Sequence, residues 1–313
     1  MNERPLITIV GPTGSGKSDL AIHLAQRFGG EVVNCDSLQV YRHFNIGTAK
    51  VPEHERQAVP HHLMDIRDPD ALFTAGEYSR MARETIAGIS ARGHIPMVVG
   101  GTGFYLQALL HGLSPTPERD EDLRARMAAK EARRPGFTHR LLRRLDPMAA
   151  SRIHARDVNK TIRAAEISLL ARKPRAEVFE AQGEPLRGYA VLSIGLNPER
   201  ARLYEKLNAR LGRMFDEGLL DEVRAILATG YGPESKPFEA LGYKQALAIL
   251  DGRHSFADAL EEARMHTRRY AKRQWTWFRR NNAAEWFDGF GTDAGLQHGV
   301  GERVATFLTT LLL

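Results

Sequence analysis

The glycine-rich stretch Gly11–Ser18, GPTGSGKS, constrains the fold more than any other part of the sequence. An apolar run of strand length, Leu6–Val10, precedes it, and Leu20–Ala25, which has the pattern of a helix start, follows it. This context makes G-x-x-x-x-G-K-[ST] a phosphate-binding loop rather than a plain glycine-rich turn. Backbone N–H groups and the helix N-terminus of such a loop point at an anion. Lys17 adds positive charge, and the Ser18 hydroxyl can ligate a magnesium ion carried by the phosphates.

The composition is that of an ordinary globular protein. Of 313 residues, 42% are hydrophobic and 26% are charged, which suits one large domain or two. The first residues lead directly into an apolar run, so we expect no signal peptide. No apolar run approaches the length of a membrane span. Cys35 is the only cysteine, which excludes disulfides within the chain and cysteine-based zinc sites. We therefore expect a cytoplasmic protein without membrane contact.

The excess of positive charge lies in one internal block. Residues 113–190 hold 17 Lys and Arg against 11 Asp and Glu, a net charge of +6, whereas the rest of the chain holds 27 of each sign. A solvated helical surface could carry such charge. Its concentration in one block favours a polyanionic partner.

The pattern of apolar runs predicts an α/β fold, a P-loop parallel sheet with helices on both faces, plus an inserted all-helical domain. Strands are expected at 6–10, 31–35, 95–99, 189–196 and, at an edge, 285–287. A capping box of Thr74 and Glu77 predicts a helix over 74–91, and further helices are expected at 104–110, 199–217, 219–229, 244–250 and 256–280. Short helices at 123–134, 138–145, 147–154, 157–172 and 175–182 have no strand between them. We therefore expect a catalytic core of 1–113 and 190–313, and a helical insertion of 114–189.

The first acidic residue at a strand end is Asp36. The strand 95–99 ends in Gly100-Gly101-Thr102, without the acid that supports magnesium in common ATP-hydrolysing P-loop proteins. Because ligands bind at the carboxyl ends of parallel strands, Asp36 and the phosphate loop should face one crevice. Asp36 is then either a base for a substrate nucleophile or a turn-capping residue, and spacing alone leaves both open.

A second signal lies near the C-terminus. Residues 264–280 hold seven Arg and Lys and no acid, interleaved with Tyr270, Trp275, Trp277 and Phe278. Basic groups with aromatic rings are typical of nucleic-acid surfaces. The alternative is an amphipathic helix with aromatic residues in the core and solvated arginines outside. The absence of compensating acids favours an anionic partner.

These features occur together in a known family. The chain resembles the bacterial tRNA dimethylallyltransferases, also called tRNA isopentenyltransferases, over residues 6–282. The matching segments are Gly11–Ser18, Asp36–Tyr41 with Ile46–Lys50, Pro60–Asp65, Val99–Gly103, Ala240–Lys244, and Thr267–Gln274 with Trp277–Arg279.

The resemblance implies a reaction. Dimethylallyl diphosphate donates its five-carbon group to N6 of the adenosine 3′ of the anticodon, in tRNAs that read codons beginning with U. The loop then holds a leaving diphosphate, whose growing charge it stabilises with Mg²⁺, and the target base is flipped into a channel. The tRNA anticodon stem-loop would be clasped by the basic insertion. We expect a monomer, although nothing in the sequence bears strongly on oligomeric state.

The resemblance also implies site residues. The catalytic group comprises Asp36 as general base, with Lys17, Ser18 and Arg210. The diphosphate-binding residues are Gly11, Pro12, Thr13, Gly14, Ser15, Gly16, Lys17 and Ser18, and Ser18 also binds the magnesium held by the diphosphate. The tRNA-binding residues are Asp36, Ser37, Leu38, Gln39, Thr102, Arg124, Lys160, Thr161, Ile162, Arg163, Ala164, Glu239, Ala240, Leu241, Gly242, Tyr243, Lys244, Lys272, Arg273, Gln274, Trp275, Thr276, Trp277, Phe278 and Arg279. The family's usual Ala-Leu-Glu is Ala164-Ala165-Glu166 here.

Three other functions compete with this one. A small-molecule P-loop kinase explains the loop and Asp36 but neither basic region. An adenylate isopentenyltransferase that makes free cytokinin needs no helical insertion. An RNA-binding protein with a vestigial loop would not need intact Lys17, Ser18 and Asp36. The pair His61-His62 is interpreted as structural or surface-exposed rather than metal-binding, because adjacent histidines point apart.

Overall fold

The computed structural model describes residues 3–179, 183–281 and 283–312. The chain forms two compact units, Met1–Leu110 with Leu186–Leu313, and His111–Pro185. The second unit therefore begins and ends slightly earlier than the insertion expected at 114–189, and Tyr189 is the first residue of a strand in the first unit. We call the first unit the core and the second unit the insertion.

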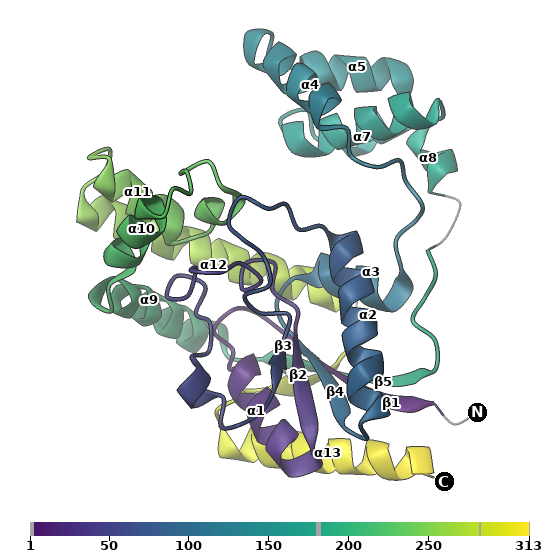
Figure 1. Cartoon of the computed structure of the whole chain (residues 1–313), viewed down its shortest axis with the longest axis vertical. Helices are drawn as coiled ribbons and strands as arrows, with labels where there is room; N and C mark the ends of the chain where they lie inside the picture. The colour runs from purple at the N-terminus through teal and green to yellow at the C-terminus, as the bar shows by residue number, and fades with distance from the viewer. Residues whose placement is uncertain (1–2, 180–182, 282, 313) are drawn as a thin grey trace. The chain divides into compact units, whose positions relative to one another are not determined.

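The core is built on a six-stranded sheet in which every pair of strands is parallel. The strands are β1 (Arg4–Val10), β2 (Gly30–Asn34), β3 (His61–His62), β4 (Ile95–Val99), β5 (Tyr189–Asn197) and β6 (Glu285–Asp288). Their order is β3-β2-β4-β1-β5-β6, with β6 at an edge as predicted. Figure 1 labels strands β1 to β5. The order places β1, which leads into the phosphate loop, at the centre between β4 and β5.

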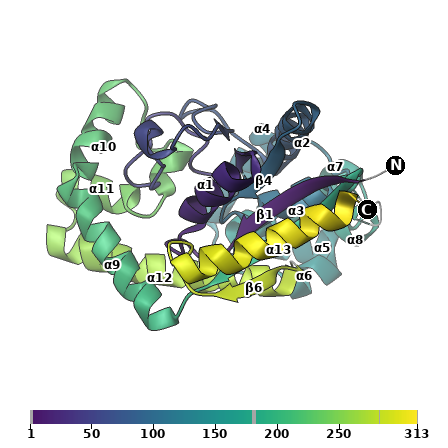
Figure 2. The same ribbon diagram turned by 90° about the horizontal axis from the view of Figure 1, so that it is seen from below.

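Helices pack on both faces of this sheet, as the apolar strands require. On one face lie α1 (Lys17–Phe28) and α13 (Ala294–Leu312) (Figure 2). They bury Leu24 and Val304 against Ile7 and Ile9 of β1. On the other face lie α2 (Ala75–Ala91), with the predicted capping box, and α3 (Gly103–His111). The α/β fold with two covered faces is thus confirmed, whereas helix α13 was not anticipated.

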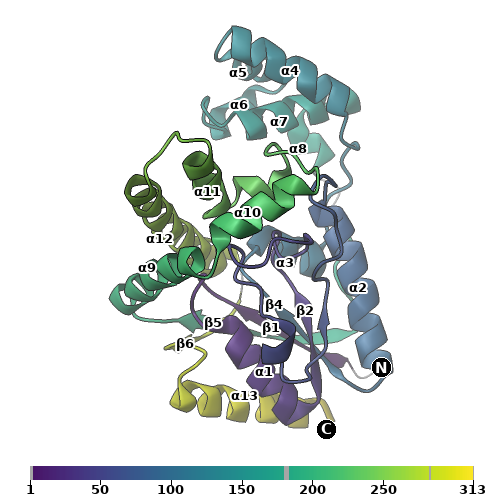
Figure 3. The same ribbon diagram turned by 60° about the vertical axis from the view of Figure 1, so that its left-hand side comes forward.

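Four helices that follow β5 form a group of their own. These are α9 (Arg200–Asp216), α10 (Leu219–Ala228), α11 (Tyr243–Leu250) and α12 (Phe256–Asn281) (Figure 3). Two 3₁₀ turns, η1 (Glu53–Glu55) and η2 (Lys236–Glu239), complete the core. Helices α9 and α12 share a small apolar cluster that includes Leu203, Leu207 and Ala271. No helix among the described residues is long and apolar enough to span a membrane.

The insertion is helical throughout its described residues. It contains α4 (Glu121–Arg133), α5 (Phe137–Leu145), α6 (Pro147–Arg152), α7 (Val158–Ala171) and α8 (Arg175–Val178) around a core that includes Met127, Leu142 and Ile162. Helices α4, α6 and α7 begin at aspartate N-caps, which satisfy first-turn N–H groups. The expected last helix ends at Val178, and residues 180–182 of that expectation lie outside the described residues.

The insertion leaves and rejoins the core at neighbouring points. The N–H of Leu186 donates to the carbonyl of Leu110 over 2.9 Å. Both residues belong to the core. The two core segments thus meet at the point where the helical unit departs.

Candidate active site

Backbone geometry shapes the phosphate loop and makes its glycines necessary. Gly16 has a φ of 84° and caps α1, and Gly11 has a φ of 144°. A Cβ at Gly11 would lie 2.9 Å from the carbonyl oxygen of Leu196, and one at Gly16 would lie 2.8 Å from the nitrogen of Gly291. Only glycine fits both positions without strain. The Lys17 ammonium donates to the carbonyls of Gly11 and Pro12, at 3.1 and 2.8 Å.

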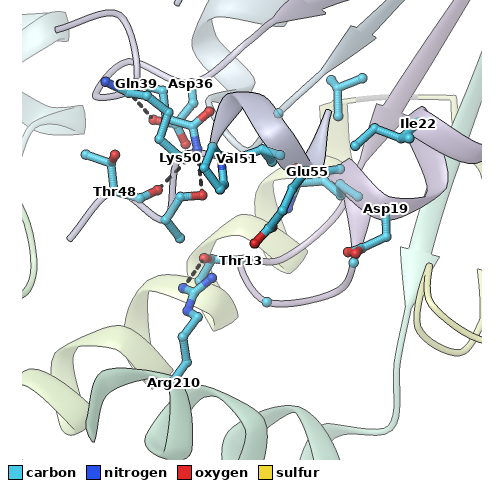
Figure 4. A pocket seen from close by; sticks show the side chains of 18 of the residues that line it. Thr13, Asp19, Ile22, Asp36, Gln39, Thr48, Lys50, Val51, Glu55 and Arg210 are labelled. Carbon is cyan, nitrogen blue, oxygen red and sulfur yellow. Dashed lines mark hydrogen bonds between the residues drawn. The ribbon is translucent and has the colours of Figure 1, made fainter. Parts of the chain in front are cut away.

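The loop and the turn after β2 line one cavity of about 1220 Å³, which lies entirely within the core. Lys17 and Ser18 line it, together with Asp36 and with Arg210 from α9 (Figure 4). The crevice expected at the carboxyl ends of the strands is therefore present. It is large enough for an elongated diphosphate ester together with part of a second reactant.

The phosphate end of the cavity is strongly cationic and desolvated. Burial lowers the pKa of Lys17 to about 8; the Asp36 carboxylate opposes this shift, and the Arg210 charge adds to it. Burial, assisted by Arg213, lowers the pKa of Arg210 to about 10. Among the described residues, the buried Ser15 Oγ and Arg210 Nε have no hydrogen-bond partner. Cations and orphan polar atoms at one place favour binding of an anion with several oxygens.

Arg210 and the loop are directly linked. The guanidinium Nη2 of Arg210 donates to Thr13 Oγ1 over 2.9 Å (Figure 4). The structure thus brings to the loop an arginine that lies nearly 200 positions away in sequence.

Asp36 combines the two roles that spacing left open. Its Oδ1 accepts hydrogen bonds from the N–H groups of Leu38 and Gln39, at 2.9 and 3.4 Å, which makes it a turn cap. Among the described residues, none donates a hydrogen bond to its Oδ2, and the side chain lines the cavity. Capping fixes the carboxylate in place and leaves one oxygen available to accept a proton.

Neighbouring side chains hold the turn after β2 in place. Thr102 Oγ1 accepts from the N–H of Ser37 over 3.0 Å, which joins the β4–α3 turn to the residue beside Asp36. Gln39 Nε2 donates to the carbonyls of Thr48 and Ala49 (Figure 4). Ser37, Gln39 and Thr102 therefore lie close to Asp36, and their contact with tRNA stays a prediction.

The supporting roles of two groups of residues at the site were not predicted from the sequence. The Glu222 carboxylate accepts from the N–H groups of Asn45 and Ile46 and from the Tyr243 hydroxyl, which in turn accepts from the N–H of Gly47. The buried Lys50 ammonium donates to Asp65, at 2.6 Å, and also to Asn45 and the carbonyl of Tyr41. Both groups depend on tertiary contacts, which local sequence patterns do not reveal.

Several residues expected to bind tRNA are on the surface. Lys160 is exposed in the insertion, and Glu239, Lys244, Lys272, Arg273, Thr276 and Arg279 are exposed in the core, whereas Arg124 of the insertion is partly buried. Within the insertion, Arg124 and Arg163 pair with the fully buried Glu166 at 3.1 and 2.7 Å, and Lys160 pairs with Asp157. These arginines are thus held by an internal carboxylate. Leu38, Leu241, Trp275 and Trp277 are partly buried.

Other residues of the expected tRNA set have buried side chains. They are Thr161, Ile162, Ala164, Ala240, Tyr243, Gln274 and Phe278, with Gly242 also buried. Thr161 donates to the carbonyl of Asp157, and Gln274 is bound to the phosphate loop and Gly101. In this structure, packing and internal hydrogen bonds occupy these side chains, and their contact with tRNA stays a prediction.

The protein groups at the loop fit a magnesium ion that arrives with a diphosphate. The described residues contain no group of three or more His, Cys, Asp or Glu able to hold a metal, and the Ser18 hydroxyl lines the cavity. One protein hydroxyl suits Mg²⁺, which keeps waters and takes its other ligands from substrate phosphates. His62 is engaged elsewhere, because its Nε2 bonds Glu31 at 2.6 Å.

Comparison with known proteins agrees with this geometry. The sequence model of the IPP transferase family matches residues 39–281 of this chain. The chain belongs to the IPP transferase family. It is 56% identical over 304 residues to a tRNA dimethylallyltransferase of Solibacter usitatus, covering 97% of this chain and 99% of that one. It is 49% identical over 311 residues to that of Koribacter versatilis, covering 99% and 100%.

Solved IPP transferase structures share the fold. A full-length tRNA isopentenylpyrophosphate transferase from Bacillus halodurans superposes with a TM-score of 0.73 at 36% identity, covering 99% of this chain and 98% of that one. A eukaryotic dimethylallyltransferase described as acting on tRNA gives a TM-score of 0.79 at 30% identity, covering 96% and 77%. The resemblance on which the expected fold and site were based is therefore confirmed at the level of the family.

Proposed function

We propose that this IPP transferase transfers a dimethylallyl group from dimethylallyl diphosphate to N6 of the adenosine 3′ of the anticodon, in tRNAs that read codons beginning with U. The observation that carries the proposal is that a cationic phosphate loop and a capped aspartate line one cavity. The names of its relatives support the same activity. A helical unit, His111–Pro185, which a free-adenylate enzyme would not need, supports a macromolecular acceptor.

The donor would bind with its diphosphate in the loop. Its C1–O bond breaks as N6 of the adenosine forms a bond to C1, and the electron pair of the broken bond leaves with the diphosphate. Lys17, Arg210 and the loop N–H groups stabilise that negative charge more in the transition state than before it. A magnesium ion bound through Ser18 would supply further charge neutralisation.

Asp36 would act on the acceptor. An exocyclic aromatic amine is a weak nucleophile, and loss of its proton during attack strengthens it. Asp36 Oδ2 takes this proton while Oδ1 stays bound to the N–H groups of Leu38 and Gln39. Ser37 and Gln39, fixed beside Asp36, would contact the edge of the base. The base reaches this depth only after leaving its stack.

We also propose that one chain is sufficient for the reaction and that it works in the cytoplasm. The loop, Asp36 and Arg210, which the proposed chemistry requires, all lie in the core of one chain. Sedimentation at the enzyme concentration of the assay tests this proposal, since a stable dimer there would contradict it.

Labelled dimethylallyl diphosphate and unmodified tRNA test the function. We expect label on the adenosine 3′ of the anticodon, released diphosphate, and dependence on added magnesium. ATP labelled at its γ-phosphate serves as the control donor. Phosphate transfer from ATP without prenyl transfer would show a kinase instead, and prenylation of free adenylate but not tRNA would show a cytokinin-forming enzyme.

A further inference from the structure

Gln274 lies inside the core and uses both ends of its carboxamide. It is on α12 with only 5% of its surface exposed. Its Oε1 accepts from the backbone N–H of Thr13 over 2.8 Å, and its Nε2 donates to the carbonyl of Gly101 over 3.0 Å. Reversing the amide would set N–H against N–H and oxygen against oxygen, so the partners fix its orientation.

The Thr13 end of this bridge fixes the diphosphate loop. Thr13 follows Gly11 and Pro12 at the start of the loop, and its side chain accepts from Arg210 on α9. The loop is therefore held at one residue from two helices, through its backbone by α12 and through its side chain by α9. Because Gln274 engages the N–H of Thr13, that donor does not point at the anion.

The Gly101 end leads to the acceptor side of the cavity. The next residue, Thr102, accepts from the N–H of Ser37, which adjoins Asp36. Gly101 and Gln274 both line the cavity, as do Thr13 and Asp36. The carboxamide thus lies between the loop for the leaving group and the turn that carries the proposed base.

We propose that Gln274 is a positioning residue that sets the separation between the diphosphate loop and the Asp36 turn. The proposal rests on the function proposed above and replaces the tRNA contact first expected of this residue. Its basis is geometric: one buried side chain joins the two backbones whose spacing decides whether C1 of the donor meets N6 of the acceptor. Misplacement of the reacting groups by about 1 Å can lower the rate about 100-fold.

The first experiment compares wild type with Gln274→Met, which keeps the length of the side chain and removes both hydrogen bonds. We expect kcat to fall about 10- to 100-fold and the affinity for inorganic diphosphate to weaken. We expect the Kd for unmodified tRNA to stay within about twofold, because the side chain does not reach the surface. A normal kcat with weakened tRNA binding would instead make Gln274 an RNA contact and overturn the proposal.

Gly101→Ala perturbs the same bridge from its other end. A Cβ at position 101 would lie 2.1 Å from Gln274 Nε2, and its three nearest atoms all belong to Gln274. Gly101→Ala alone should therefore displace the carboxamide and lower kcat. In a Gln274→Ala background that clash is gone, so adding Gly101→Ala should cost little more. Such coupling identifies a shared contact, whereas fully additive losses would contradict the proposal.

The readouts separate this proposal from the function on which it rests. If the wild-type protein moved no prenyl group to tRNA, the proposed function would be wrong. Inorganic diphosphate binding would still test the bridge in that case, because it needs only the loop. If Gln274→Met and Gly101→Ala both kept the wild-type affinity for diphosphate and unfolding temperatures near wild type, the proposed role of Gln274 would be wrong. The proposed function would not be affected.

Discussion

At the scale of single residues, the site depends on side chains that do two things at once. Asp36 shows this most clearly, since one carboxylate oxygen caps the turn while the other faces the cavity. Because the hydrogen bonds of the turn fix the orientation of the carboxylate, its second oxygen approaches the reacting atom from a fixed direction. It also means that a simple truncation removes structure and chemistry together, so a matched variant is needed.

Asp36→Asn separates the two roles. Asparagine keeps an oxygen that can accept from the N–H of Leu38, but its amide is not a base. We expect turnover to fall about 100-fold or more, the usual scale for a lost acid–base group, with tRNA Kd and unfolding temperature nearly unchanged. Asp36→Ala should lose the same activity and some stability as well. Wild-type turnover in Asp36→Asn would assign the base elsewhere.

At the scale of elements, β2 is fastened to its neighbours by one buried carboxylate. Glu31 accepts from His62 Nε2 on β3, at 2.6 Å, and from Arg92 Nη2 after α2, at 2.8 Å. Burial alone would raise its pKa, but the hydrogen bonds from His62 and then Arg92 outweigh burial, so the pKa lies below its usual 4.5. The stabilisation is therefore present above pH 4.5 and is lost as the pH falls through the lowered value.

Glu31→Gln tests this linkage. At pH 7 we expect the free energy of unfolding to fall by about 1–3 kcal/mol, because Arg92 loses a buried anionic partner. The difference from wild type should shrink below pH 4.5. Glu84→Gln, which alters an exposed pair with Arg80 on α2, should change stability little at any pH. A constant difference across the acid range would rule out the linkage.

Helix α12 shows how one element serves two surfaces. Its buried positions, Ala263, Thr267, Ala271, Gln274 and Phe278, recur at helical spacing and face inward. Lys272 and Arg273 are exposed between them. The exposed Lys272 and Arg273 therefore lie on the outer face, whereas the inner face carries Phe278 and Gln274 and supports the site.

Replacing Lys272 and Arg273 with Ala should weaken tRNA binding and reduce its dependence on salt, because fewer phosphates are neutralised. Inorganic diphosphate affinity should stay unchanged. The matched control is Arg80→Ala with Arg224→Ala, which removes two exposed cations that already pair with carboxylates of their own helices. An unchanged salt slope in the α12 variant would show that this face does not contact RNA.

Local patterns were enough for much of the fold and for part of the site. Apolar runs between glycines located β4 at Ile95–Val99, and the motif located the loop at Gly11–Ser18. Gln274 was expected to bind tRNA, although its spacing from Ala271 and Phe278 already placed it on the apolar face of the helix. The hydrogen bonds that Glu222 and Tyr243 make with residues 45–47 could not be predicted, since the partners are 176 to 196 residues apart in the sequence. Helix α13 was missed because three glycines, 295, 299 and 301, weaken its helical pattern.

At the scale of the whole molecule, the division of labour between the units can be tested by excision. Because Leu110 and Leu186 already share a hydrogen bond, a short Gly-Ser linker should replace residues 111–185 with little strain and a small loop-closure cost. We expect the shortened protein to unfold cooperatively and to bind inorganic diphosphate like wild type, but to lose prenyl transfer to tRNA. Diphosphate binding that disappears despite a folded core would show that the loop depends on the insertion.

The position of β1 in the sheet has a consequence for the order in which the protein matures during translation. Its two neighbours are β4, made before the insertion, and β5, made after it. One edge of the central strand therefore stays unpaired until all of His111–Pro185 has left the ribosome, whereas that unit already holds its own apolar core. Since units tend to fold as they emerge, nascent chains arrested when residue 186 has just left the ribosome should protect the amides of α5 and α7 from exchange before those of β1. The insertion therefore folds before the central strand β1 has paired with both of its neighbours.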